Sequence, residues 1–270
     1  MTREDWLLII INASLEAGRE ILDVYSADFS VGLKTDSSPI TQADKNAHHI
    51  IINALEQTNL PIISEEEEQT PYQKRKGWKQ FWMVDPLDGT KEFVNRNGEF
   101  TVNIALIENG KPTMGVIYIP VQQTLFFADK LAYKIESFSK PIFSIANLLV
   151  NAEQLPLIQN RSNFIVLASR SHMNEQTTSF INKLKENYTH LTIQQKGSSL
   201  KLCTIAENSA DIYPRFGPTM EWDIAAGHAI INAAGGSVIN WETKNSLQYN
   251  KENLLNPSFI VNSISQIQSL

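Results

Sequence analysis

The strongest signal in the chain is the stretch Trp82-Met83-Val84-Asp85-Pro86-Leu87-Asp88-Gly89-Thr90-Lys91-Glu92-Phe93. An apolar strand runs into Asp85, Pro86 restricts the backbone, and Gly89 allows a tight bend. Two carboxylates three residues apart at such a turn can bind one hard cation, with the Leu87 carbonyl as a further oxygen ligand. The backbone N–H groups of residues 89–91, at a helix start, would form an anion site. A cation site beside a phosphate site is what phosphoryl chemistry requires.

Acidic residues elsewhere decide whether this stretch is a site. By itself, Asp-Pro-x-Asp-Gly is more typical of an ordinary surface turn. Four consecutive glutamates, Glu65–Glu68, follow a short apolar strand, and Asp223 stands at the start of an apolar helix. Alone, the first would indicate a solvated loop and the second a helix cap. Three acidic sites at strand ends or helix starts in one chain favour a shared function.

Working outward, the first half of the chain indicates helices followed by a meander of strands. Thr2 as N-cap and apolar residues at helical spacing predict a helix over 3–26. Thr41 with Asp44 resembles a capping box and opens a second helix that ends near residue 57. Asn109-Gly110 predicts a hairpin turn. Strands are expected over 62–63, 81–84, 101–107, 113–119, 124–128 and 132–135. This order indicates an α+β arrangement.

The second half alternates between strands and helices. Segment 136–163 has weak periodicity and two prolines, so we place the domain junction there. Beyond it we expect strands over 164–168, 191–195, 212–214 and 237–241, and helices over 174–187, 199–208 and 224–233, an α/β layer. The prediction is an α+β / α/β layered sandwich of two domains. Residues 1–140 would carry the main metal and phosphate site, and residues 141–270 would contribute Asp223 and the substrate-recognition side.

Composition limits the partners. The net charge of −6 argues against a polymeric nucleic acid partner, which needs a basic face. A small anionic substrate needs only a local positive site, and a metal can supply it. The single cysteine, Cys203, cannot form an internal disulfide, and no apolar run is long enough to span a bilayer. These features predict a cytoplasmic protein, and they leave open a homodimer and a peripheral contact on the cytoplasmic side of the inner membrane.

Several motifs together resemble the inositol monophosphatase superfamily. They are Ser64-Glu65-Glu66, Asp85-Pro86-Leu87-Asp88-Gly89-Thr90, Trp222-Asp223 and Ala233-Ala234-Gly235-Gly236. Within the superfamily, the bacterial 3′(2′),5′-bisphosphate nucleotidases are similar in further segments. Those segments are Lys34-Thr35-Asp36-Ser37-Ser38-Pro39, residues 89–93, residues 95–100, Gly197-Ser198-Ser199-Leu200-Lys201 and residues 213–219. The resemblance covers nearly the whole chain.

The resemblance implies a role for each matching residue. Glu65, Asp85 and the Leu87 carbonyl would hold a first Mg²⁺, and Asp85, Asp88 and Asp223 a second. The four-glutamate run leaves Glu66 as an alternative to Glu65. Thr90, paired with Asp44, would orient and deprotonate the attacking water. The mechanism implied is two-metal in-line displacement, with no phosphorylated residue. Inhibition by lithium at the second ion position is a further implication.

The resemblance also implies a substrate, adenosine 3′,5′-bisphosphate, which is a by-product of sulfate assimilation. The substrate-binding residues would be Glu65, Leu87, Asp88, Gly89, Thr90, Ser198, Lys201 and Asp223. Ser198 and Lys201 would hold the phosphate that is not cleaved, with Arg215 as a second basic residue in the matching segment. His172 resembles a nucleotide contact in related enzymes. Without the resemblance, Lys201 could equally be a solvated helix lysine.

Other functions are weighed against this one. Haloacid-dehalogenase-type enzymes also contain Asp-Gly-Thr, but their two acids lie two residues apart, whereas Asp85 and Asp88 lie three apart. A metal-dependent nucleotide-binding module would not need Asp44 and Thr90 as a water-activating pair. Within the superfamily, inositol monophosphatase and fructose 1,6-bisphosphatase activities remain alternatives, because substrate choice depends on the pocket rather than the fold.

Overall fold

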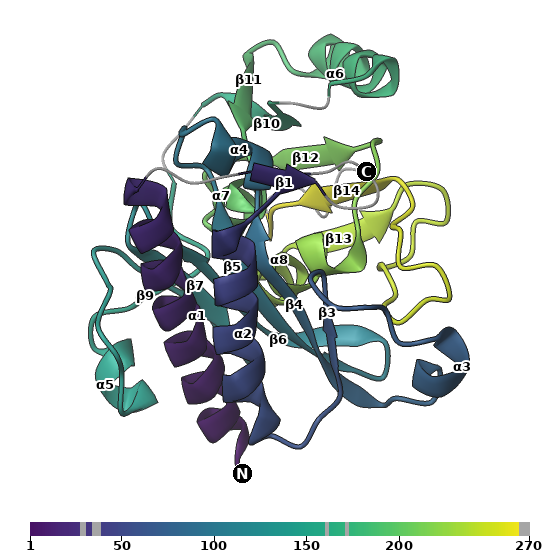
Figure 1. Cartoon of the computed structure of the whole chain (residues 1–270). Helices are drawn as coiled ribbons and strands as arrows, with labels where there is room; N and C mark the ends of the chain where they lie inside the picture. Colours follow the sequence, from purple (N-terminus) through teal and green to yellow (C-terminus); the bar gives the residue numbers. More distant parts are fainter. Residues whose placement is uncertain (28–30, 34–38, 160–161, 171–172, 265–270) are drawn as a thin grey trace.

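Helices and sheets alternate in layers through the molecule (Figure 1). The structure is a computed structural model that describes residues 1–27, 31–33, 39–159, 162–170 and 173–264. Two long helices, α1 (Arg3–Ser26) and α2 (Gln42–Glu56), pack side by side. Thr2 and Asp5 form a capping box at the start of α1, as the sequence predicts. The apolar faces of both helices cover one side of the larger sheet.

The larger sheet has seven strands in the order β3-β4-β5-β6-β7-β8-β9. Their bounds are β3 Ile62–Ser64, β4 Gln80–Asp88, β5 Thr101–Glu108, β6 Lys111–Ile119, β7 Thr124–Ala128, β8 Ala132–Ile135 and β9 Glu153–Gln154. All neighbours are antiparallel except β3 and β4. Asn109 and Gly110 both have positive φ, so the predicted hairpin turn is confirmed as a two-residue turn.

Helix α8 (Glu221–Ala233) lies on the other face of the larger sheet, beside α7 (Leu200–Ala206). It contacts strands β4, β5 and β6, and it also contacts β13 (Ser237–Asn240) of the smaller sheet. A Cβ atom at Gly227 would lie 2.3 Å from Cδ1 of Leu202, so only glycine allows α7 to come this close. One apolar cluster therefore joins residues of both sheets.

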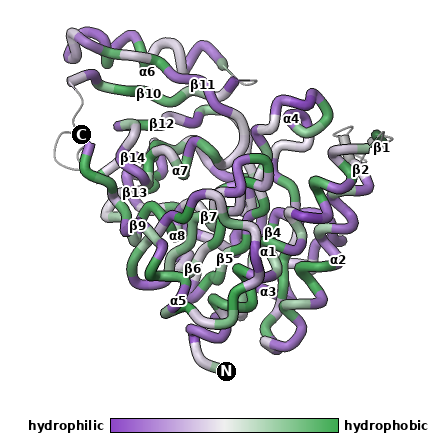
Figure 2. The backbone as a smooth tube through the Cα atoms, turned by 90° about the vertical axis from the view of Figure 1, so that its left-hand side faces the viewer, coloured by the Kyte–Doolittle hydropathy of each residue, from purple (hydrophilic) through white to green (hydrophobic). Residues whose placement is uncertain are grey.

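The smaller sheet has the order β11-β10-β12-β14-β13, and α6 (Glu175–Asn187) covers its outer face. The remaining strands are β10 Phe164–Ser169, β11 Leu191–Lys196, β12 Ile212–Arg215 and β14 Phe259–Asn262. In Figure 2, α6 and this sheet lie at the opposite end of the molecule from the N-terminus. Strand β14 was not predicted, although it lies between β12 and β13. The pairs β10–β11 and β10–β12 are parallel and the others antiparallel.

The layered α+β sandwich expected from the sequence is confirmed. Short elements complete it: β1 Val31–Leu33, β2 Pro39–Thr41, α3 Tyr72–Arg75, α4 Thr90–Val94 and α5 Ile145–Leu149. The division into residues 1–140 and 141–270 stays a prediction. No helix in the described part of the chain is long and apolar enough to cross a membrane.

The candidate active site

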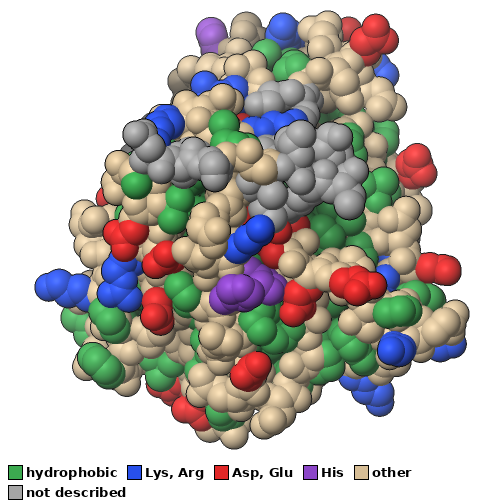
Figure 3. All heavy atoms as spheres, in the orientation of Figure 1, with side chains coloured by type: hydrophobic (Ala, Val, Ile, Leu, Met, Phe, Trp, Pro, Cys, Tyr) green, Lys and Arg blue, Asp and Glu red, His purple; other side chains and the backbone are tan. Residues whose placement is uncertain are grey.

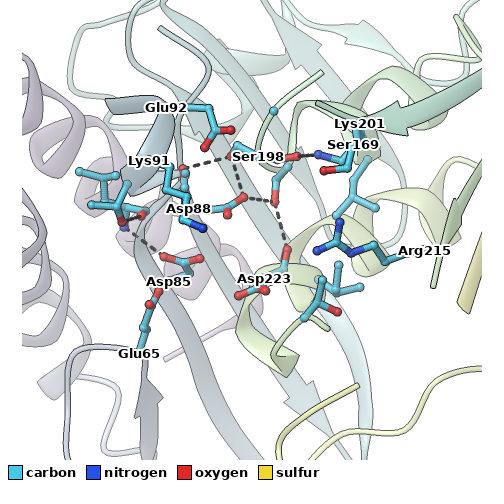
Figure 4. A pocket seen from close by; sticks show the side chains of 18 of the residues that line it. Glu65, Asp85, Asp88, Lys91, Glu92, Ser169, Ser198, Lys201, Arg215 and Asp223 are labelled. Atoms are coloured by element: carbon cyan, nitrogen blue, oxygen red, sulfur yellow. Dashed lines mark hydrogen bonds between the residues drawn. The ribbon is translucent and has the colours of Figure 1, made fainter. Parts of the chain in front are cut away.

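One cavity collects nearly all of the sequence-predicted site residues (Figure 4). The cavity opens where the ends of β3 and β4 meet the starts of α4, α7 and α8. Its wall contains the predicted residues Glu65, Asp85, Leu87, Asp88, Gly89, Thr90, Ser198, Lys201 and Asp223. Asp44 is buried behind this wall and is hydrogen-bonded to Thr90. The predicted His172 and the segment 34–38 lie outside the described residues.

A bulge at the end of β4 brings its two acids together. Asp85 pairs with Asn103 of β5 and Asp88 with Thr101, so the register shifts between the two acids. In a regular strand, side chains three residues apart point to opposite faces, and an extra residue removes this alternation. Gly89 then turns the chain into α4 with φ of +92°. Figure 4 shows the carboxyl groups of Asp85 and Asp88 facing the same space.

Asp223 reaches the cavity from the first turn of α8. The helix begins at Glu221, three residues earlier than predicted, so Asp223 occupies the third helical position. Its Oδ2 accepts a hydrogen bond of 2.9 Å from the backbone N–H of Met220. This bond closes the helix N-terminus and fixes the carboxylate in place.

The clustered carboxyl groups raise one another's pKa values. The pKa of Asp85 is raised well above its ordinary value, first by burial and then by the charges of Glu65, Asp88 and Asp223. Burial also raises the pKa of Asp223, with Asp88 and Glu65 adding to the shift. The side chains of Asp85 and Glu65 are hydrogen-bonded to each other, which requires a proton between two carboxyl groups. Such crowding is favourable only when protons or cations compensate the negative charge.

Two serines hold the carboxylate of Asp88, a role that the site prediction did not give them. Ser198 and Ser199 both donate to its Oδ2, at 2.6 and 2.8 Å. The Ser199 hydroxyl lies 3.0 Å from the Asp223 carbonyl oxygen, and Nδ2 of Asn103 donates to that hydroxyl at 3.0 Å. Gly197-Ser198-Ser199 was singled out in the sequence, but only for substrate contact. No local signal points to Asn103, because its role depends on strand register.

Thr90 and Asp44 form the predicted pair. Oγ1 of Thr90 donates to Oδ1 of Asp44 at 3.2 Å. Oδ2 of Asp44 accepts from the backbone N–H and hydroxyl of Thr41, at 2.7 and 2.6 Å. Asp44 is only 1% exposed, so its position is set by these bonds rather than by solvent. The lone pairs of Thr90 Oγ1 are left to accept a hydrogen bond from the cavity side.

Comparison with known proteins identifies the family. Residues 3–269 match the model of the inositol monophosphatase family. The chain belongs to the inositol monophosphatase family. It is 43% identical to the 3′(2′),5′-bisphosphate nucleotidase CysQ of Salmonella typhimurium, covering 91% of this chain and 94% of the relative. It is 42% identical to the protein of the same name from Escherichia coli K12, with the same coverage.

Solved structures agree with the family. The crystal structure of CysQ from Bacteroides thetaiotaomicron, a bacterial member of the inositol monophosphatase family, superposes with a TM-score of 0.90 at 45% identity. It covers 97% of this chain, and this chain covers 98% of it. An inositol monophosphatase from Thermotoga maritima shares the fold, with a TM-score of 0.73 at 20% identity over 98% of this chain and 94% of that protein.

Catalysis in this family is metal-dependent, and the donor set of the cavity fits a metal ion. Four carboxyl groups and a backbone carbonyl are hard oxygen ligands. Among the described residues, no three Asp, Glu, His or Cys side chains are already arranged around one point as metal ligands. Asp88, for example, is turned towards the two serines. Burial first and neighbouring carboxylates second raise the pKa values of Asp85 and Asp223, and a cation bound among these groups would favour their charged forms.

The charges on one face of the molecule are mixed. On the face shown in Figure 3, acidic and basic side chains are interspersed among the described residues and no continuous basic band appears.

Proposed function

We infer that this chain is a 3′(2′),5′-bisphosphate nucleotidase. It hydrolyses the 3′-phosphate of adenosine 3′,5′-bisphosphate, a by-product of sulfate assimilation, to adenosine 5′-monophosphate and phosphate. The main support for this function is the sequence identity of 42–45% to proteins named CysQ, over nine-tenths or more of the chain, together with the acidic cavity. A cytoplasmic location, a homodimer and contact with a membrane surface stay predictions.

We propose that the cavity binds two Mg²⁺ ions. Glu65, Asp85 and the Leu87 carbonyl would hold one, and Asp85, Asp88 and Asp223 the other. When bound, the ions supply an activated water and neutralise the charge that develops on the leaving oxygen. Oxygen ligands without nitrogen or sulfur suit Mg²⁺ better than zinc.

The residues of the chain then have separate tasks. Thr90 accepts a hydrogen bond from the attacking water at Oγ1, while its own proton stays directed at Asp44, whose second oxygen is held by Thr41. The backbone N–H groups of residues 89–91 lie before and in the first turn of α4, where such groups lack helical partners. They are suited to hold the oxygens of the phosphate being cleaved. Ser198 and Lys201 remain the proposed contacts of the other phosphate.

The test of this function is a substrate panel with purified protein. We expect Mg²⁺-dependent release of phosphate from adenosine 3′,5′-bisphosphate, in preference to inositol monophosphate and fructose 1,6-bisphosphate. Asp88→Asn should lower kcat by roughly a hundredfold or more, because one well-placed electrostatic group is lost. Asp23→Asn, an exposed acid on α1, is the matched control. Full activity in a chelator would contradict the metal chemistry, and a preference for inositol monophosphate would contradict the substrate.

A further inference from the structure

His48 joins helix α2 to the turn that carries Glu65. Its Nδ1 lies 2.9 Å from the Ser64 hydroxyl oxygen, and the two residues are only 7% and 1% exposed. Ser64 is the last residue of β3, so Glu65 follows it directly. Figure 4 shows Glu65 at this strand end with its side chain directed towards Asp85. A buried hydrogen bond therefore anchors the chain beside a proposed metal ligand.

The surroundings of His48 assign its ring proton. Nε2 faces the carboxylate of Glu67 at 3.9 Å, which favours a proton on that nitrogen. The backbone N–H of Glu66 donates to the Ser64 hydroxyl oxygen at 3.5 Å, which leaves the hydroxyl proton for Nδ1. Burial, with the charge of His49 adding to it, lowers the pKa of His48 and keeps the ring neutral at pH 7. The Ser64 hydroxyl therefore donates to Nδ1 of His48.

The turn beyond Ser64 is a run of four glutamates with identical chemistry, Glu65–Glu68. The structure describes all four, and of these only Glu65 lines the cavity. The backbone N–H of Glu65 donates to the Val84 carbonyl at 3.1 Å, but any residue of the run could donate such a bond. The run itself cannot decide which carboxylate faces the cavity. A side-chain contact next to the run can, and the hydrogen bond of Ser64 to His48 is such a contact.

Helix α2 connects this turn to the pair proposed to orient the attacking water. Asp44 and His48 are four residues apart, so they lie on the same face of α2, one turn from each other. Asp44 accepts a hydrogen bond from Thr90 at 3.2 Å, whereas His48 holds Ser64. One helix face thus positions both the start of α4 and the end of β3.

We propose that His48 is a positioning residue whose hydrogen bond to Ser64 selects Glu65, rather than Glu66, as the carboxylate that faces the metal site. The inference rests on the proposed function, because it concerns a ligand of the proposed first Mg²⁺. It adds a residue that acts on this ligand through the chain and does not touch the substrate. Groups that orient a metal ligand typically change metal affinity by about tenfold to a hundredfold.

The experiment measures Mg²⁺ binding without substrate, by isothermal titration calorimetry, beside phosphate release from adenosine 3′,5′-bisphosphate. His48→Leu removes the acceptor and should raise the Mg²⁺ dissociation constant by about tenfold to a hundredfold, while kcat recovers at saturating Mg²⁺. His48→Asn keeps an acceptor on Cγ, the atom that carries Nδ1 in histidine, and should restore most of the affinity. His49→Leu, at the exposed neighbouring histidine, is the matched control and should change neither readout.

Two further comparisons test the hydrogen bond and the selection separately. Ser64→Ala removes the same bond from the other side, so it should match His48→Leu, and the double variant should lose no more than either. Glu65→Gln should raise the Mg²⁺ dissociation constant by about tenfold or more. Glu66→Gln should change it little, because this carboxylate is held away from the cavity.

The outcomes separate the inference from its alternatives. An unchanged Mg²⁺ dissociation constant in His48→Leu would overturn it, as would equal losses in Glu65→Gln and Glu66→Gln. A loss in His48→Asn as large as in His48→Leu would show that packing matters and not the hydrogen bond, and would overturn it too. If His48→Leu does not fold, Ser64→Ala decides. A wild-type protein that binds no Mg²⁺ and stays active in a chelator would reject the proposed metal chemistry itself.

Discussion

At the residue scale, the position of Asp88 depends on the hydroxyl groups of two serines. Ser198 and Ser199 donate to the same oxygen of Asp88, and Asn103 holds the Ser199 hydroxyl in turn. Ser199 is 2% exposed, so its hydroxyl group is positioned by these protein partners rather than by bulk solvent. Groups that orient a metal ligand are expected to matter nearly as much as the ligand.

Ser199→Ala tests this orientation. We expect the Mg²⁺ concentration for half-maximal activity to rise by about tenfold to a hundredfold, because the Asp88 carboxylate loses one of its two donors. Activity should recover at saturating Mg²⁺, which a merely misfolded protein would not do. Titration of phosphate release against Mg²⁺ measures the effect, and Ser179→Ala, an exposed serine on α6, is the control. An unchanged Mg²⁺ titration would show that Ser199 only closes the loop.

Some site residues could be predicted from the sequence, and others could not. Asp85, Asp88 and Asp223 could be chosen because acids at strand ends and helix starts form a recognisable pattern. Asn103 could not be given its role. Its hydrogen bond to Ser199 depends on the register of β5 against β4, which is not a property of local sequence.

At the element scale, the regular helices and strands of the chain follow their periodicity. The helix expected over 3–26 is observed as Arg3–Ser26, because its cap and its apolar spacing agree. β14 (Phe259–Asn262) was missed although other strands as short were predicted, and its place between β12 and β13 comes from antiparallel pairing with both. The start of α8 was placed too late, because Met220 carries no recognisable cap side chain.

Helix α8 also carries a buried titratable group, His228. Its ring is fully buried and hydrogen-bonded to the Tyr249 hydroxyl at 2.9 Å. Burial lowers the pKa of His228 from 6.5 to about 3. Below pH 6.5 the imidazole of His228 therefore binds a proton in the unfolded chain but not in the folded chain. The free energy of unfolding consequently falls as the pH drops from 6.5 towards 3.

This linkage predicts a specific acid sensitivity. Between pH 7 and pH 5, His228 should remove about 2 kcal/mol from the free energy of unfolding, since each pKa unit corresponds to about 1.4 kcal/mol. In His228→Gln, that part of the slope should disappear, whatever the stability at pH 7. Urea unfolding at several pH values measures it, with His190→Gln, an exposed histidine, as the control. Identical slopes in wild type and His228→Gln would contradict the assignment.

At the scale of the whole molecule, the acidic cluster joins parts of the chain that are far apart in sequence. Asp85 and Asp88 come from β4 of the larger sheet, whereas Asp223 comes from α8, which packs between the two sheets. Burial raises the pKa values of Asp85 and Asp223, and repulsion between the carboxylates across that junction adds to the shift. A cation bound among them would replace repulsion with attraction, so metal binding should stabilise the fold as a whole and not only the site.

We therefore expect Mg²⁺ to raise the melting temperature. At a concentration a hundredfold above its dissociation constant, one ion adds about 2.7 kcal/mol, or roughly 5–10 °C for a chain of this size. Asp223→Asn removes a proposed ligand and should lose most of this shift, while its metal-free protein becomes no less stable, because a repelling charge has gone. Asp23→Asn should keep the full shift. Calorimetry with and without Mg²⁺ would measure it, and an equal shift in Asp223→Asn would exclude Asp223 as a ligand.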